Sequence, residues 1–187
     1  MEMERDAADE AASSLRLLDT HFRQRPVTKA LCFINPDEPK PTQAAAPTPM
    51  NDRIVDHMVA SIREIVDLTY DTAPKEPGPA PERPADFYRW CLDSTEGADE
   101  EAQLRRDIVI QRQRMEHAIQ MGEYKVVRPH PCPACRTWGL QWDRFRKAAV
   151  CLNRRCQDRN GMANTWTLAR LATQHVVQQE NRARRAT

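Results

Sequence analysis

Apolar residues in the first two thirds of the chain recur at steps of three and four residues, the spacing expected of amphipathic helices. In the first stretch these positions are Ala8, Ala11, Leu15, Leu18 and Phe22. We expect a helix here that ends near Arg25 and Pro26. In the second stretch they are Ile54, Met58, Ile62, Ile65 and Val66. Asn51 precedes this second stripe and can cap its helix.

Two more helices are expected before residue 125. The shorter one places Phe87, Trp90 and Cys91 on one face, and such an aromatic patch is typical of a surface that docks on a neighbouring helix. The longer one lies within Glu96 to Gly122 and carries acids near its positive N-terminal end.

The longer helix has a narrow apolar seam. Its members are Leu104, Ile108, Met115 and Ile119. We expect this seam to pack against the helix that contains Ile54 rather than to form a dimer, because the repeat lasts barely three heptads. His117 lies off the seam and is given no special role.

The pattern changes after residue 130. Trp138, Leu140 and Trp142 alternate as on one face of a strand, and residues 145–150 can form the return strand after a turn at Asp143 and Arg144. A C-terminal helix is expected to begin at Asn164 or Thr165. The positions predicted for its inner face are Leu168, Leu171, Ala172, His175 and Val176.

Four cysteines surround the predicted hairpin and have the spacing of a metal site. They are Cys132, Cys135, Cys151 and Cys156. Two short cysteine knuckles joined by a pair of strands suit tetrahedral zinc, and four thiolates leave no open position for catalytic water. We therefore predict one structural zinc ion, with an iron–sulfur cluster or ordinary buried thiols and disulfides as alternatives.

Two histidines near this motif are not expected to be metal ligands. His130 could replace a cysteine ligand, but beside Pro131 it is expected to be exposed to solvent or to support the ligands. His175 is expected to pack in the core of the C-terminal helix.

The C-terminal residues resemble the zinc ribbon. Their pattern is also similar to that of small uncharacterised proteins of actinobacteria and their phages. The matching residues are Cys132, Pro133, Cys135, Cys151, Asn153, Cys156, Trp166, Leu168, Leu171 and Ala172. The resemblance covers about a quarter of the chain and implies no particular activity.

The predicted fold is thus mainly α, with amphipathic helices joined by proline-rich linkers and followed by a small C-terminal zinc ribbon made of a β-hairpin and a helix. Residues 1–33 form an N-terminal helical segment and residues 34–50 a linker rich in proline and alanine. Residues 51–124 form a helical region that contains a second proline-rich linker at 73–84, and residues 125–187 form the ribbon module.

The charge of the chain also changes sign at the predicted boundary between residues 124 and 125. The 187 residues carry a net charge of +1, with 28 basic and 27 acidic side chains. Residues 125–187 hold 13 basic and 3 acidic side chains, so the charge of this segment is +10 and that of residues 1–124 is −9. The two parts are therefore expected to face different partners or, in part, each other.

The sequence has no apolar run long enough to span a bilayer, and its acidic first residues contain no apolar signal core. We expect a cytoplasmic protein, in which Cys32 and Cys91 are free, buried thiols. Motifs for phosphate-binding loops, zinc proteases and serine hydrolases are not found. Catalysis is therefore the least favoured class of function.

Two binding functions remain. The favoured one is a nucleic-acid-binding or transcription-associated regulator, with DNA or RNA contacted by residues 125–187. The basic residues for this role are Arg136, Arg144, Arg146, Lys147, Arg154, Arg155 and Arg159. Trp138 or Trp142 could stack on an unpaired base, although both are expected to fill the ribbon core instead.

The alternative is a protein-interaction adaptor, a modulator encoded by a phage or mobile element, or a structural component. In this function the helical N-terminal half would dock on a partner protein and zinc would be purely structural. The sequence leaves the oligomeric state open.

Overall fold

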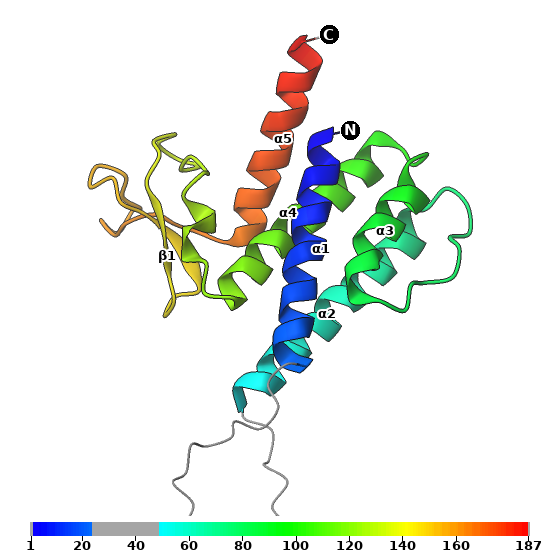
Figure 1. The fold of residues 1–187 in the computed structure, drawn as a ribbon. Coiled ribbons are helices and arrows are strands. Elements are labelled where there is room, and N and C mark those ends of the chain that lie inside the picture. The colour runs from blue at the N-terminus through cyan, green and yellow to red at the C-terminus, as the bar shows by residue number, and fades with distance from the viewer. Residues whose placement is uncertain (1, 24–48, 187) are drawn as a thin grey trace, which may run out of the picture.

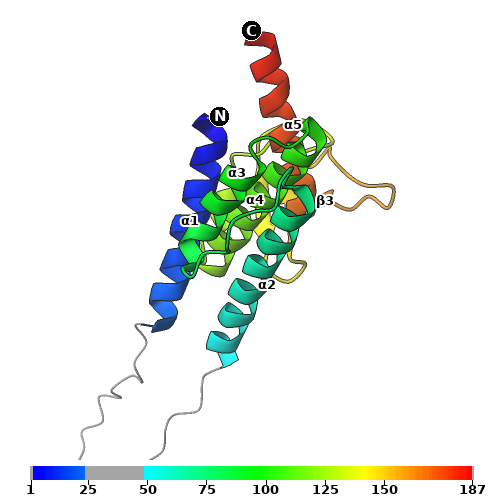
Figure 2. The same ribbon diagram turned by 90° about the vertical axis from the view of Figure 1, so that its right-hand side faces the viewer.

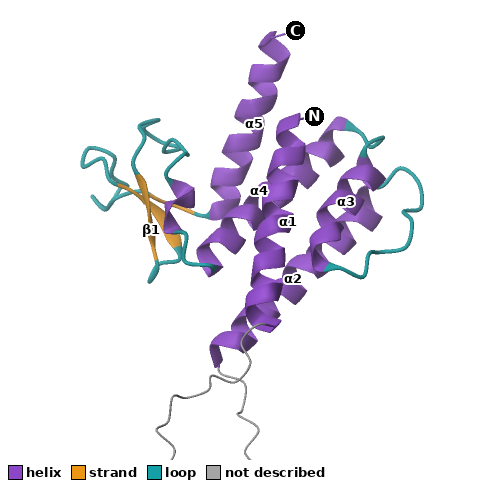
Figure 3. Cartoon of the chain, viewed as in Figure 1, coloured by secondary structure: helices purple, strands orange, loops and turns teal. Residues whose placement is uncertain are grey.

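The computed structural model describes residues 2–23 and 49–186. Most of the predicted linker 34–50 lies outside these residues, as do Cys32 and the predicted helix end at Arg25 and Pro26. The described chain is mainly helical, with a small antiparallel sheet beside the helices (Figures 1 and 3). This confirms the predicted mainly α class.

Five α-helices form the described helical part. They are α1 (Glu2–Arg23), α2 (Pro49–Thr72), α3 (Phe87–Thr95), α4 (Glu100–Gln120) and α5 (Leu168–Ala186). Two short 3-10 helices, η1 (Pro84–Asp86) and η2 (Tyr124–Val127), precede α3 and follow α4. α2 begins two residues before Asn51, the predicted cap. α1 and α2 run in opposite directions, with α3 and α4 packed against them (Figure 2).

The predicted stripes of the first helices form one core. Buried side chains of α1, α2, α3 and α4 meet in a cluster that we call the helical core; they are Ala8, Ala11, Leu15, Leu18, Met58, Ile65, Phe87, Tyr88, Cys91 and Ile110. The aromatic patch of α3 docks on α2, as predicted, with the Trp90 ring 6.0 Å from the Tyr70 ring. The predicted burial of Cys91 is confirmed as well.

The seam of α4 faces a different neighbour from the one predicted. Ile108, Met115 and Ile119 pack in a second cluster, the module core, instead of packing against α2. The other buried members of the module core are Val127, Leu140, Ala149, Leu168, Leu171, Ala172 and three cysteines, Cys132, Cys151 and Cys156. α4 therefore contributes apolar side chains to both cores.

α4 faces α2 with polar side chains. His117 is fully buried, which overturns the prediction that it has no special role. Its Nδ1 lies 2.8 Å from His57 Nε2 of α2, and its Nε2 lies 2.6 Å from the Tyr88 hydroxyl of α3. That hydroxyl donates to Gln113 Oε1 at 2.7 Å. Gln113 in turn donates to the Ser61 carbonyl oxygen and to Glu64 Oε2 of α2.

The sheet has the order β1-β2-β3 and is antiparallel throughout. β1 (Leu140–Asp143) pairs with β2 (Ala148–Cys151), and β3 (Thr165–Trp166) pairs with β2 on its other side. The strands of the hairpin are shorter than predicted, because its turn occupies residues 144–147 instead of two residues. In this turn the Asp143 carboxylate accepts the backbone N–H groups of Phe145 and Arg146.

α5 begins later than predicted because Thr165 and Trp166 form a strand. Thr167 then caps the helix, and its hydroxyl accepts the Arg170 N–H at 3.2 Å. The inner face of α5 is as predicted for Leu168, Leu171, Ala172 and Val176, which are buried. No helix in the described ranges is both long enough and apolar enough to cross a membrane.

Candidate metal centre

The four predicted cysteines converge at one end of the hairpin. Their sulfur atoms all lie within 4.8 Å of one another. Cys132 Sγ is 3.8 Å from Cys156 Sγ, and Cys135 Sγ is 3.7 Å from Cys151 Sγ. Sulfurs placed 2.3 Å from a central ion at the corners of a tetrahedron are about 3.8 Å apart, so the sulfur positions fit a tetrahedral metal ion. The distances are too long for disulfide bonds, and all four thiols are free.

The first pair of ligands lies in a tight turn. The backbone N–H of Cys132 donates to the Thr137 carbonyl oxygen, and that of Arg136 donates to the Cys132 carbonyl oxygen, both at 2.9 Å. Arg136 closes this turn in the left-handed region, with φ of 61°. The turn brings Thr137 back to Cys135, where its backbone N–H donates to the sulfur and its hydroxyl lies 3.0 Å away.

The second pair is separated by four residues instead of two, and Asn153 accommodates the longer spacing. The Cys156 N–H donates to the Asn153 carbonyl oxygen at 2.8 Å, and the Asn153 side chain accepts the Arg155 N–H. The Asn153 backbone N–H donates to Cys151 Sγ. Asn164 completes the loop by donating from Nδ2 to Cys156 Sγ at 3.2 Å.

Burial and hydrogen bonding act in opposite directions on these thiols. Hydrogen bonds from Thr137 lower the pKa of Cys135 to about 6. Desolvation raises the pKa of Cys151 to about 12 and also raises the pKa of Cys156. Four thiolates in such a buried cluster require a cation, so metal binding must release protons and couples to folding.

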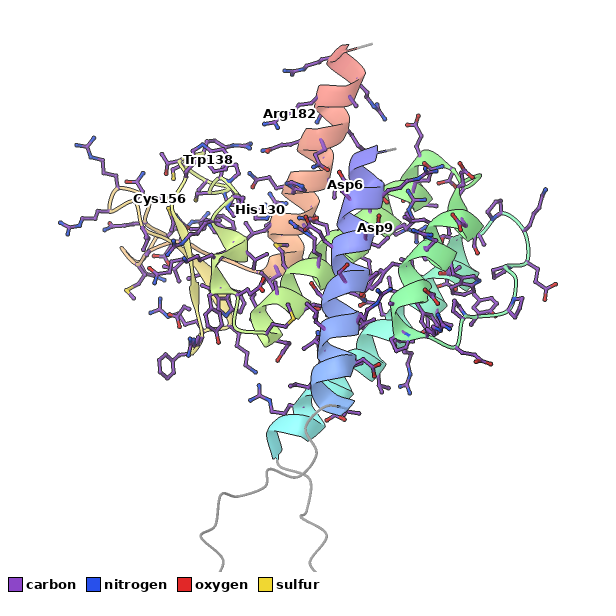
Figure 4. The ribbon with its side chains drawn as sticks, viewed as in Figure 1. Asp6, Asp9, His130, Trp138, Cys156 and Arg182 are labelled. Atoms are coloured by element: carbon purple, nitrogen blue, oxygen red, sulfur yellow. The ribbon has the colours of Figure 1, made fainter. Side chains whose placement is uncertain are left out.

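His130 was predicted to be exposed, but it is buried. It is 3% exposed and lies beside α5 (Figure 4). Its ring packs edge-on against His175 of this helix, with ring centroids 5.0 Å apart. Burial, followed by the charges of His175 and Arg114, lowers the pKa of His130 to about 4. Gln174 of α5 donates to the Pro131 carbonyl oxygen at 3.3 Å. Residues 130–131 are thus held against α5, on the side of the turn away from solvent.

The predicted nucleic-acid-binding residues lie on the outside of the module. All seven are exposed. Only Arg146 pairs with a carboxylate among the described residues, 3.8 Å from Asp143. Arg144, Arg146 and Lys147 form the hairpin turn around Phe145, whose side chain is 100% exposed. Arg154, Arg155 and Arg159 follow the second pair of ligands.

The expectation that both tryptophans fill the module core is wrong for Trp138. This side chain is 66% exposed and lies at the edge of the module (Figure 4). Its position follows from the cysteine turn, which delays the strand until Leu140. Trp142 is half-buried and packs against the module core.

A groove that the sequence did not indicate separates the hairpin from the helices. It has a volume of about 630 Å³ and is lined by side chains of α2, α4, η2, the hairpin and the start of α5. Arg53 and His57 of α2 face Trp142, Arg144 and Lys147 of the hairpin across it. Spacing along the chain gives no signal for this groove, because its lining residues come from elements that are far apart in the sequence.

Neither the protein-family models, nor the curated proteins, nor the solved structures that were compared with this chain include a match.

Proposed function

We propose that the chain is a non-enzymatic, zinc-dependent nucleic-acid-binding protein, of the kind that regulates transcription. The observation that supports this best is the charge around the cysteine cluster. Seven exposed cations lie on the same module as two exposed aromatic side chains, Trp138 and Phe145, and six of the cations have no carboxylate partner among the described residues. Unpaired cations attract phosphates and release counterions, and neighbouring aromatic rings can stack on unpaired bases.

Zinc is the metal that this proposal assigns to the cluster. Cys132, Cys135, Cys151 and Cys156 supply four sulfur ligands at tetrahedral spacing, as in the zinc ribbon that the motif resembles. A closed four-thiolate site holds the hairpin and the loops in place and supplies no water for hydrolysis. Thiolates kept free for metal also suit the reducing cytoplasm, which is the location we propose.

Metal analysis separates zinc from the iron–sulfur alternative. Protein expressed in zinc-supplemented medium should contain one zinc per chain and be colourless. Visible absorption with stoichiometric iron and sulfide would replace zinc in this proposal.

The binding function is tested with the full-length, zinc-loaded chain. Single-stranded DNA and RNA oligonucleotides are titrated at low and high salt, and chelation of the metal is the loss-of-fold control. We expect binding that weakens steeply with salt. Arg154→Glu combined with Arg155→Glu should weaken binding by about tenfold or more, because each reversal replaces an attraction to phosphate by a repulsion.

The matched control reverses the same amount of charge on the helical part. Arg63 and Arg83 are exposed and lie on α2 and just before η1. Their double reversal to Glu should leave affinity within about twofold, since long-range effects of exposed charges are screened. Equal losses of affinity in the two double variants would show that binding depends on net charge alone, which would contradict a defined basic face.

The protein-adaptor function has one specific observation in its favour. Phe145, Leu152 and Met162 are exposed apolar side chains of the same module, at 100%, 59% and 52%. Phe145 and Leu152 also line one shallow hollow of the module, and exposed apolar side chains that lie together are typical of a protein-docking surface. If the zinc-loaded chain has no affinity for DNA or RNA, a partner protein bound through this module, or through the helices, becomes the preferred function.

A further inference from the structure

The groove between the hairpin and α2 has the composition of a nucleotide site. It combines three cations, Arg53, Arg144 and Lys147, with the half-buried rings of Trp142 and Tyr124. Its volume of about 630 Å³ lies within the range of small-molecule sites in proteins, about 300–1,000 Å³. A phosphorylated nucleoside presents the complementary pair of features, an anionic phosphate and a flat ring.

The charges of the groove are not neutralised from within. Arg53, Arg144 and Lys147 have no carboxylate partner among the described residues. The carboxylate that does line the groove, Glu116, is held by Arg112 of the same helix at 3.1 Å. The groove therefore keeps an excess of positive charge, and a low-dielectric wall strengthens its field.

The aromatic rings are presented in a fixed orientation. Trp142 lies in β1 opposite Ala149 of β2 and packs against the module core. Tyr124 is covered by the Arg144 guanidinium, 4.0 Å from the ring centroid, an arrangement that holds the arginine side chain over the groove. Trp142 is thus the aromatic side chain available to a base, and Arg144 is already placed beside it.

The opposite wall is also held in place. His57 reaches His117 with a 2.8 Å hydrogen bond, and His117 is tied to Tyr88 and through it to Gln113. Burial, followed by the charge of Arg112, lowers the pKa of His57. The imidazole is therefore neutral near pH 7 and leaves the positive charge of this wall to Arg53.

We propose that this groove holds one unpaired nucleotide, with its base against Trp142 and its phosphate between Arg53, Arg144 and Lys147. The inference rests on the proposed nucleic-acid function and deepens it, because it makes α2, a helix of the acidic part of the chain, a component of the binding site. The nucleotide could belong to a bound single strand or be free in solution, and the experiment separates these sources.

The first test is Arg53→Glu in the full-length, zinc-loaded chain, with Arg63→Glu on the same helix as the matched control. Both arginines are exposed, but only Arg53 lines the groove. We expect Arg53→Glu to weaken binding of a short single-stranded oligonucleotide by about tenfold and to lower the salt dependence, log K against log salt, by about 0.7. Arg63→Glu should change affinity by less than about twofold.

The second test locates the base by tryptophan fluorescence. Stacking on a base quenches indole emission, and Trp138 is the exposed competitor of Trp142. We expect ligand-induced quenching to persist in Trp138→Phe, where Trp142 reports a base in the groove, and to be reduced in Trp142→Phe, a variant that keeps an aromatic ring in the module core. Quenching that is lost with Trp138 and retained without Trp142 would overturn the groove assignment.

Adenosine 5′-monophosphate is titrated in parallel with the oligonucleotide. Oligonucleotide binding that is equally strong in the Arg53→Glu and Arg63→Glu variants refutes the groove and leaves the proposed function standing. Binding of the mononucleotide alone, sensitive to Arg53→Glu, supports the groove as a site for free nucleotide and refutes the proposed function. Absence of binding by either ligand refutes both.

Discussion

At the scale of single residues, Tyr88 of α3 is hydrogen-bonded to α4 through its buried hydroxyl group. It is 1% exposed, and its hydroxyl group joins His117 and Gln113 of α4. Both partners are buried and depend on this group for one hydrogen bond each. A buried polar atom that loses its only partner retains its full desolvation penalty.

Tyr88→Phe should therefore destabilise the protein although it removes one oxygen atom. We expect a loss of about 1–3 kcal/mol in the free energy of unfolding, measured by urea denaturation. Tyr70→Phe is the control, because Tyr70 is 53% exposed, and its loss should be below about 0.5 kcal/mol. Similar values for the two variants would show that the network is not stabilising.

His117 makes this network sensitive to pH. Burial, followed by the charge of His57, lowers its pKa to about 3. The titratable groups that contact it are His57 of α2 and Tyr88 of α3. Glu64 of α2 joins the same network through Gln113, and it pairs with Arg112 of α4, which also pairs with Glu116. Because the unfolded state binds a proton near pH 6.5 and the folded state does not, stability is fully present above pH 6.5 and is lost as the pH falls toward 3.

The expected loss is on the order of a few kcal/mol over that range. Urea denaturation from pH 7 to 4 should show a steeper decline for the wild type than for His117→Gln, which lacks the titrating group. Burial raises the pKa of Glu116 and acts in the opposite direction, but it does so in both proteins. Parallel declines would assign the acid sensitivity to other groups.

At the scale of elements, the cysteine turn depends on a strained backbone at Arg136, with φ of 61°. A side chain in the left-handed region costs about 1–2 kcal/mol, and glycine avoids this cost. The free energy of unfolding of the metal-bound module should therefore be higher for Arg136→Gly than for Arg136→Ala, by roughly 1 kcal/mol. Thermal denaturation of the two variants measures this difference. Both variants remove the same charge, so their affinities for an oligonucleotide should fall equally.

The sequence predicted those elements whose signal lies in spacing. The four cysteines, the α1 stripe from Ala8 to Leu18 and the inner face of α5 lie where the pattern placed them, because burial of an apolar face and ligation of a metal both impose a period on the chain. The side chain of Phe22, the last member of the α1 stripe, lies outside the described residues. The seam of α4 was assigned to the wrong neighbour, since periodicity identifies the apolar face of a helix and not the element that covers it.

Buried polar residues were missed for a related reason. His117 and Gln113 are as enclosed as Met115, yet a pattern of apolar positions does not register them. His130 was predicted to be exposed because its burial depends on α5, an element about forty residues away in the chain. The exposure of Trp138 and the position of the groove beside Trp142 likewise depend on the residues at which the turns end. The spacing of apolar residues alone does not determine these positions.

At the scale of the whole molecule, two cores are stabilised by different means. The helical core consists of helix packing, whereas the module core is closed by the cysteine cluster. A metal ion bound by this cluster would supply a large share of the folding free energy of such a small unit.

Cys156→Ser should therefore abolish stoichiometric metal binding and increase hydrogen exchange across residues 131–167, while amides of α1, α2 and α3 keep their protection. Cys91→Ser is the reciprocal control, because Cys91 is fully buried in the helical core and is not a member of the cluster. It should retain one metal ion per chain and lose protection in α3. Collapse of both cores in either variant would show a single cooperative unit.

Because α4 contributes to both cores, it determines which fragments of the protein can be prepared in soluble form. A fragment that begins at residue 125 would leave part of the buried face of α5 uncovered, since α4 packs against α5. Such a fragment is expected to aggregate even when loaded with metal. A soluble minimal piece should begin ahead of Asp99, whose carboxylate caps α4 by accepting the Ala102 N–H.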